Sequence, residues 1–152
     1  MSKKLFIFVF LLPFQLLLAQ SSQLTDFPEG YTPEEVGKRL AYRFVDGKHA
    51  LHAGKWISYP ETFNWNGALQ LAKITKDKKL FKLLENKFEP LFTMERKLLP
   101  IMNHVDLNMF GSLPLNLYQM TKKKKYLKLG LPYADTQWEV PENAKPSEKE
   151  WA

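Results

Sequence analysis

Two polar stretches carry the side chains with the clearest potential for chemistry. The first, Lys48 to Pro60, contains His49 and His52, and imidazole nitrogens are common metal ligands. Their spacing would suit a metal site on a helix, but Gly47 and Gly54 make this stretch rich in turns. A protein metal site needs at least three ligands, and no third candidate lies nearby. We therefore predict a surface loop with ordinary histidines and no metal site.

The second polar stretch, Asn103-His104-Val105-Asp106, precedes a run of apolar residues. Asp is a frequent helix cap, because its carboxylate accepts hydrogen bonds from the free amides at a helix start. One role for Asp106 is therefore to cap a helix that begins near Leu107. Contact with a ligand is compatible with that role, because one carboxylate can serve both.

Aromatic residues make up 14% of the chain and include four tryptophans, Trp56, Trp65, Trp138 and Trp151. In helical proteins such rings usually fill the core, because each buries a large apolar area. Carbohydrate-binding clefts use the same rings as stacking platforms. For Trp65 we expect a core position, with a platform for a sugar ring as the alternative.

An internal repeat with an offset of 46 residues aligns Thr75 with Thr121. The apolar positions before each threonine coincide, as do the lysine-rich segments that follow: Leu69, Leu71 and Ile74 match Leu115, Leu117 and Met120, and Lys76, Lys78 and Lys79 match Lys122, Lys124 and Lys125. Such self-similarity indicates stacked supersecondary units. Each unit has the pattern of a helix, a tight polar turn and a second helix, and Asp106 lies at the mouth of the second hairpin.

The first helix of the mature chain has a strong start signal. Thr32 fits the N-cap, Pro33 fits the first helical position and Glu35 completes a capping box. Apolar residues at a spacing of four predict one buried stripe of this helix, Val36, Leu40 and Phe44, with Ala41 and Val45 beside it. We expect the helix to end near Gly47.

Further helices are expected at 63–75, 79–92, 106–120 and 126–138, from apolar residues at helical spacing. Gly67 would permit close approach of a neighbouring helix or a ligand. Pro90 should end or kink the third helix, and Pro114 fits the fourth only if its regular part begins near Leu113. Residues 140–152, rich in Pro, Glu and Lys, are predicted to form an exposed loop. The fold class is therefore all-α.

Residues 1–20 have the features of a secretory signal peptide. Lys3 and Lys4 precede an almost unbroken apolar run from Leu5 to Leu18, and Ala19 precedes the polar Gln20. We expect cleavage near Ala19-Gln20, a secreted or periplasmic location, and no stable membrane association afterwards; a retained anchor is the alternative. The chain has no Cys, which excludes disulfides and a lipid-anchored lipoprotein.

The formal net charge is +6, and removal of Lys3 and Lys4 leaves 6 − 2 = +4. Much of the positive charge lies in the two matching lysine-rich turns, which predicts a solvated rim. Such a rim could also attract an acidic polysaccharide by long-range steering. Nucleic-acid binding is not expected, because it favours Arg and interleaved aromatic residues in a groove.

After the signal peptide, residues 21–31 form a polar leader and residues 32–152 a helical domain. Arrays of hairpins need about three repeats or a capping unit to bury their apolar faces. The repeats here are followed by a Pro- and Glu-rich loop, and the last unit shows no polar outer face. We therefore expect the domain to be the front part of a longer protein.

The order of several motifs resembles the unsaturated rhamnogalacturonyl hydrolases of glycoside hydrolase family 105, relatives of the family 88 unsaturated glucuronyl hydrolases. The resemblance covers nearly all of the mature chain, and its order and spacing are more specific than any single motif. The matching segments are Thr32-Pro33-Glu34, Trp65-Asn66-Gly67-Ala68-Leu69, Ile74-Thr75-Lys76-Asp77, His104-Val105-Asp106, Gly111, Leu117-Tyr118-Gln119-Met120-Thr121 and Lys125-Tyr126-Leu127.

The resemblance implies an (α/α)6 barrel, in which six helical hairpins close into a ring around the substrate. It also implies a pectin-degrading activity on oligosaccharides of unsaturated galacturonate and rhamnose, without a cofactor. In that chemistry a carboxyl group protonates the C4=C5 double bond of a 4,5-unsaturated uronic acid and water adds at C5. The resulting hemiketal opens and releases the neighbouring sugar.

Carried over to this chain, Asp106 matches the family Asp that binds the unsaturated sugar, with His104 as a further polar group and Trp65 as a ring platform. The family's general acid lies in a Trp-x-Asp motif, and the chain ends at Ala152 without it. Asp77 and Asp135 do not replace it, because one lies in a turn and the other on a returning helix. We therefore expect no catalytic residue in this chain, and no activity from the chain alone.

Two other functions also fit a helical-hairpin array. The chain could be a non-enzymatic helical-repeat module that binds carbohydrate or acts as a scaffold. It could also belong to another (α/α) toroid enzyme, such as a sugar epimerase or a polysaccharide lyase.

Overall fold

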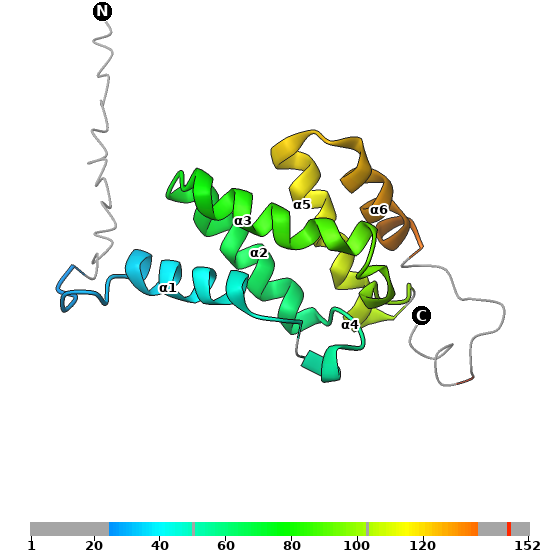
Figure 1. Ribbon diagram of the computed structural model, residues 1–152, viewed down its shortest axis with the longest axis horizontal. Helices are drawn as coiled ribbons and strands as arrows, with labels where there is room; N and C mark the ends of the chain where they lie inside the picture. Colours follow the sequence, from blue (N-terminus) through cyan, green and yellow to red (C-terminus); the bar gives the residue numbers. More distant parts are fainter. Residues whose placement is uncertain (1–24, 50, 103, 137–145, 147–152) are drawn as a thin grey trace, which may run out of the picture.

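The computed structural model describes residues 25–49, 51–102, 104–136 and 146, and throughout these residues the chain is all-α, as predicted (Figure 1). The α-helices are α1 (Pro33–Asp46), α2 (Tyr59–Ile74), α3 (Lys78–Phe88), α4 (Val105–Asn108), α5 (Ser112–Thr121) and α6 (Lys124–Asp135). Short 3₁₀ segments occupy Leu51–Gly54, Glu89–Phe92, Arg96–Leu98 and Met109–Gly111.

The predicted repeat is present as two helical hairpins, α2–α3 and α5–α6. The hydroxyls of Thr75 and Thr121 each donate to the carbonyl four residues earlier, at 2.8 and 2.7 Å. The next residues, Lys76 and Lys122, both adopt left-handed backbone conformations, with φ of 55° and 59°. Helices α3 and α6 then begin at positions that differ by 124 − 78 = 46. The two turns are therefore the same local structure.

Helices α2 and α5 pack side by side and run in the same direction (Figure 1). Asn66 Nδ2 donates to Ser112 Oγ at 2.8 Å, and these residues are separated by the repeat offset, 112 − 66 = 46. Asn116 Nδ2 in turn donates to Asn66 Oδ1 at 2.8 Å. Equivalent positions of the two hairpins thus lie next to each other. The two hairpins therefore pack in register, like two adjacent wedges.

Apolar side chains from both hairpins form one core. Phe88 lies near its centre, with ring centroids 5.5 Å from Trp65, 6.0 Å from Phe110 and 5.6 Å from Tyr126. All four rings are almost completely buried. The core also contains Ala41 from α1 and leucines from α2, α3, α5 and the 3₁₀ segment after α3: Leu69, Leu80, Leu84, Leu91, Leu113 and Leu117. The hairpins therefore stabilise each other through shared apolar burial.

Helix α1 begins as predicted, and Phe44 of its expected apolar stripe packs against the core, but Leu40 does not. Thr32 caps it, and Pro33 and the capping-box contact to Glu35 are both present. Leu40, expected in the buried stripe, is 64% exposed, whereas Ala41 is buried. The reason is that α1 packs against both α2 and α3. The small residues Gly37 and Ala41 allow this close approach and therefore lie on the side of α1 that contacts them. A Cβ at Gly37 would lie 3.2 Å from Leu71.

Several helix boundaries differ from those predicted. Helix α2 starts at Tyr59 rather than 63, because a proline such as Pro60 is tolerated in the first turn. Helix α3 ends at Phe88, and Pro90 lies in the following 3₁₀ turn, as its missing amide hydrogen requires. The predicted helix at 106–120 is divided into α4, a 3₁₀ turn and α5, so Pro114 falls in the first turn of α5.

Within the described part of the chain, no helix is long and apolar enough to span a membrane. The signal peptide predicted at 1–20 and most of the loop predicted at 140–152 lie outside the described residues, as do Trp138 and Trp151.

Candidate functional site

The two longer connections, between α1 and α2 and between α3 and α4, meet at one end of the hairpins (Figure 1). The amide of Ile57 in the first connection donates to the carbonyl of Leu98 in the second, at 2.8 Å. Tyr133 at the end of α6 donates its hydroxyl to the carbonyl of Pro100 at 2.6 Å. The tight turns of both hairpins lie at the opposite end. We call these the connection end and the turn end.

Asp106 and His104 lie at the connection end, and both are exposed. Asp106 is in the first turn of α4, and the N-cap of that helix is His104. The amides of Leu107 and Asn108 donate to the carbonyl of His104, at 2.9 and 2.8 Å. The expectation that Asp106 caps a helix starting near Leu107 is therefore wrong, because the helix starts two residues earlier. The Asp106 carboxylate is accessible to a ligand.

Trp65 is fully buried in the core, which corrects the ring-platform alternative. Its ring lies edge-on to Phe44 at 5.4 Å and near Phe88 on the other side, and its Nε1 donates to the carbonyl of Leu84 at 3.3 Å. No ring face is free for a sugar. The physical reason is position: residue 65 lies on the side of α2 that faces α1 and α3.

Other aromatic rings are exposed at the connection end. Tyr59 and Phe63, one turn apart on α2, are 44% and 56% exposed and pack edge to face at 6.3 Å. Trp56 stacks on His52 at 4.9 Å. Tyr59 and Phe63 are therefore exposed aromatic side chains of α2 at this end, and neither was among the predicted site residues. Their position four apart on α2 was the available clue.

A buried polar cluster at the connection end also escaped prediction. His49 Nδ1 contacts Glu61 Oε1, and His49 Nε2 lies 3.5 Å from Glu95 Oε2. The imidazole stacks on the Trp65 ring at 5.8 Å, so His49 is a packed residue and not an ordinary surface histidine. The side chains of His49 and Glu61 are only 9% and 5% exposed. The cluster clamps both connections onto α2.

The sequence contained one clue to this cluster. Ser58 and Glu61 have the spacing of a capping box, yet Ser58 makes no side-chain cap bond, and the Glu61 side chain contacts His49. Ser58 Oγ and Glu61 Oε2 are buried without a hydrogen-bond partner in the described structure. Nearby, burial lowers the pKa of Lys87, whose ammonium group donates to the carbonyl of Gly47. Among the described residues, no group of His, Asp and Glu has the arrangement of a metal site.

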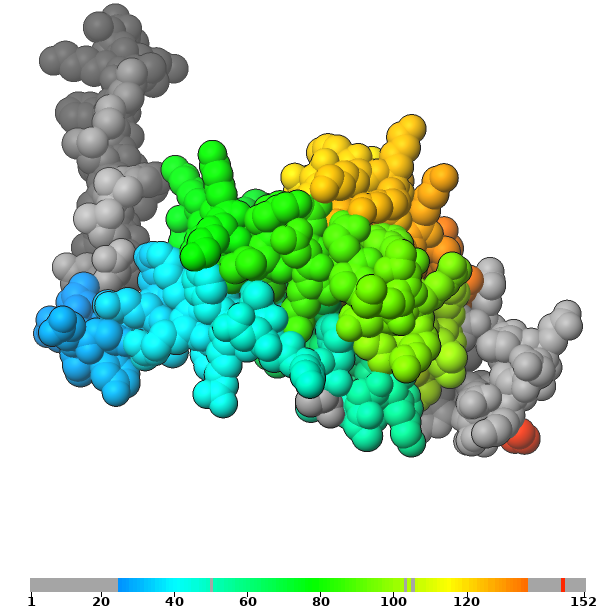
Figure 2. Space-filling view, viewed as in Figure 1, coloured from blue at the N-terminus to red at the C-terminus, as the bar shows by residue number. Residues whose placement is uncertain are grey.

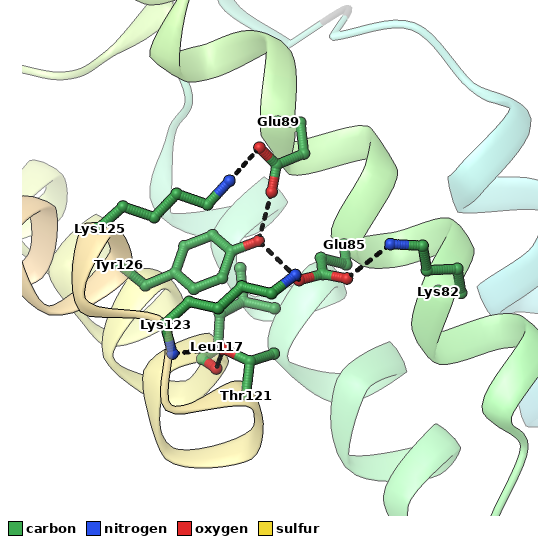
Figure 3. A network of polar contacts seen from close by, with 8 residues as sticks. All are labelled: Lys82, Glu85, Glu89, Leu117, Thr121, Lys123, Lys125 and Tyr126. Carbon is green, nitrogen blue, oxygen red and sulfur yellow. Dashed lines mark hydrogen bonds and ion pairs between the residues drawn. The ribbon is translucent and has the colours of Figure 1, made fainter.

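A second polar network joins the two hairpins at their outer side (Figure 3). Glu85 on α3 is buried and accepts hydrogen bonds from Lys82 at 3.0 Å, from Tyr126 at 2.9 Å and from Lys123. Burial opposes ionisation of Glu85, but these three donors outweigh it and lower its pKa to about 2. Burial and the carboxylates of Glu89 and Glu85 raise the pKa of Tyr126.

Glu89 extends this network by accepting from Tyr126 at 2.6 Å and pairing with Lys125. The predicted rim of solvated lysines is therefore only partly correct. Lys123 and Lys125 turn toward α3, whereas other lysines of the two turns project into solvent. The network serves stability, because its charges are already matched within the protein.

A groove runs between α2 and α5 at the turn end, with a volume of about 570 Å³. Its lining consists of polar and charged side chains with one apolar residue: Gln70, Lys73, Asn116, Gln119, Met120 and Lys122. Gln70 and Asn116 are equivalent in the repeat, as are Lys73 and Gln119, each pair being 46 residues apart. The two hairpins therefore present the same face to this groove. Gly67 on this side of α2 has open space around it, with no close helix.

The groove and Asp106 lie at opposite ends of α5. Asp106 precedes its N-terminus, whereas Gln119 and Lys122 lie at its C-terminus. Of the three residues predicted to bind substrate, the structure brings Asp106 and His104 together and buries Trp65 apart from them. Lys122 belongs to the predicted lysine rim, whereas Lys73 and the amide residues of the groove were not among the predicted residues.

Comparison with known protein families, with curated proteins and with solved structures gives no match. The arrangement of the side chains themselves must therefore support any functional assignment.

Proposed function

We propose that the chain forms two adjacent wedges of an (α/α)6 toroid that hydrolyses unsaturated uronic acid residues of pectin-derived oligosaccharides. The observation that carries the proposal is the in-register packing of α2 and α5, with equivalent residues Asn66 and Ser112 hydrogen-bonded across the interface. Repetition of such parallel wedges around an axis generates a ring whose inner helices present one shared face. The polar face of α2 and α5 is suited to the centre of such a ring, where a sugar substrate would bind.

Asp106 supplies the second line of support. Its exposed carboxylate lies at the connection end, where the rings of Tyr59 and Phe63 are also exposed. A carboxylate accepts hydrogen bonds from sugar hydroxyls, and an aromatic face packs against the apolar side of a sugar ring. In the proposed reaction Asp106 holds the hydroxyls of the unsaturated ring. In this proposal Asp106 takes no part in protonation of the double bond.

Binding of an unsaturated galacturonyl-rhamnose disaccharide to the full chain tests the proposal. We expect specific changes in two-dimensional NMR amide signals near Asp106, and a loss of about tenfold or more in affinity for Asp106→Asn, since a charged hydrogen-bonding partner is removed. The matched control is Asp135→Asn, an exposed aspartate at the end of α6. Equal affinities for Asp106→Asn and the unmodified chain would contradict the proposal.

Turnover of the same disaccharide tests separately whether the described reaction has its proton donor in this chain. Loss of absorbance from the double bond should not occur with this chain. Clear turnover would show that the proton donor lies within these 152 residues.

A second candidate function is a carbohydrate-binding module without catalysis. The observation that favours it is the groove at the turn end, whose six lining residues include no carboxylate that could act as an acid or base. An intact groove with no effect of Asp106→Asn on any sugar would favour this alternative.

A further inference from the structure

The groove at the turn end is lined by two lysines, Lys73 and Lys122. Within the described residues, neither Lys73 nor Lys122 forms an ion pair, and none of the residues lining the groove is acidic. Their neighbours behave differently, because Lys123 is paired with Glu85 on α3 and Lys125 with Glu89 just after α3. In the second turn, Lys123 and Lys125 thus join an internal network, whereas Lys122 lines the groove. The groove therefore carries uncompensated positive charge.

The position of Lys122 is set by the backbone. Its left-handed conformation, φ 59°, forms the helix end, and its ammonium group lies 5.8 Å from the centre of the Tyr118 ring. The left-handed conformation costs about 1–2 kcal/mol for a residue with a side chain, so a glycine would be the ordinary choice. The equivalent turn residue, Lys76, has the same conformation. Both turns project from one edge of the molecule (Figure 2).

The remaining lining residues suit a hydroxylated ligand. Gln70, Asn116 and Gln119 each offer an amide that can donate and accept. Asn116 is held in place by its hydrogen bond to Asn66, which also ties the two helices together. Met120 adds one apolar contact surface. A volume of about 570 Å³ lies within the usual range for small-molecule sites.

We propose that this groove binds an acidic oligosaccharide, with Lys73 and Lys122 contacting uronate carboxylates and the three amides contacting ring hydroxyls. Cations and bifunctional amides around a shallow groove match a ligand that carries both anions and hydroxyls. The site is distinct from Asp106, at the other end of α5, and it requires no double bond in the ligand. The proposed groove site therefore does not depend on the proposed hydrolysis. It would hold uronate units that are adjacent to one another in a polymer.

Isothermal titration of the full chain with a saturated galacturonate tetrasaccharide tests the proposal. This ligand has no double bond, so it reports on the groove and not on recognition of the unsaturated sugar. The variant Lys73→Gln/Lys122→Gln should lose on the order of tenfold or more in affinity, because two charged partners are removed. Binding should also weaken as salt is raised, since the lysines are exposed. A galactose tetrasaccharide without carboxylates should bind far more weakly.

The matched control is Lys78→Gln/Lys124→Gln. It removes the same charge from equivalent exposed positions of the two turns that do not line the groove. This control should retain affinity within about twofold, a change of under 1 kcal/mol. Circular dichroism should show that both double variants are folded, because all four lysines are exposed.

Three results would overturn the proposal. One is unchanged affinity of the Lys73→Gln/Lys122→Gln variant. Another is an equal loss in the control pair, which would indicate a diffuse positive rim. The third is equal binding of the neutral tetrasaccharide. Failure of Asp106→Asn to affect the unsaturated disaccharide would instead refute the proposed function and leave the groove intact.

Discussion

Replacement of Glu85 by Gln should destabilise the protein in a pH-dependent way. The carboxylate is buried between the hairpins and accepts from Lys82, Lys123 and Tyr126, which lower its pKa from 4.5 to about 2 (Figure 3). Each pH unit corresponds to roughly 1.4 kcal/mol, so a difference of 4.5 − 2 = 2.5 gives the ionised form a stabilising contribution of about 3 kcal/mol.

The sign of the pH dependence follows from the direction of this pKa difference. Because the pKa of Glu85 is lower in the folded protein, its contribution is complete above pH 4.5 and is lost as the pH falls toward 2. Glu85→Gln keeps the volume but removes the charge. The free energies of unfolding of Glu85→Gln and the unmodified chain should therefore differ by about 3 kcal/mol at pH 7 and converge between pH 4.5 and 2.

Urea unfolding followed by circular dichroism at several pH values measures this difference. The control is Glu34→Gln, which removes an exposed carboxylate paired with Lys38 at 2.7 Å on one helix. Such exposed pairs contribute about 0.3–0.5 kcal/mol. A loss below about 1 kcal/mol for Glu85→Gln at pH 7, or a loss that does not change between pH 7 and pH 3, would refute the reasoning.

Three further changes have expected outcomes that thermal or urea unfolding can measure. Gly111→Ala should destabilise by about 1–3 kcal/mol, because the new Cβ would lie 2.5 Å from Tyr133 Cβ. Lys122→Gly should stabilise by about 0.5–1 kcal/mol, because glycine adopts its left-handed conformation without steric cost. His49→Ala should destabilise by about 3 kcal/mol, because it leaves the buried carboxylate of Glu61 without its hydrogen-bond partner.

Controls for these changes come from the same chain. Gly67→Ala on the open side of α2 should stabilise by about 0.5–1 kcal/mol, because nothing lies within 4 Å of the new Cβ. Lys78→Gly, in the first turn of α3, should destabilise by up to about 1 kcal/mol. Equal effects of alanine at Gly111 and Gly67 would contradict the explanation from steric overlap. Equal effects of glycine at Lys122 and Lys78 would contradict the explanation from backbone conformation. No effect of His49→Ala on stability would contradict the role of its contact with Glu61.

Local sequence patterns predicted the features that depend on neighbouring residues. The capping box at Thr32, the proline that ends α3 and the two threonine-lysine turns are determined by hydrogen bonds and backbone conformations within a few residues. The offset of 46 residues also showed that two similar hairpins follow one another. These features required no knowledge of which surfaces would meet.

The tertiary structure alone decided which surfaces meet. Leu40 lies outside and Ala41 inside because α1 approaches two helices at once. His49 pairs with Glu61 across 12 residues, and Tyr126 reaches Glu85 across 41, distances at which sequence spacing carries no information on contact. The groove likewise exists only because α2 and α5 lie in register. Its polar residues can be found in the sequence, but their common face depends on the packing of one hairpin against the other.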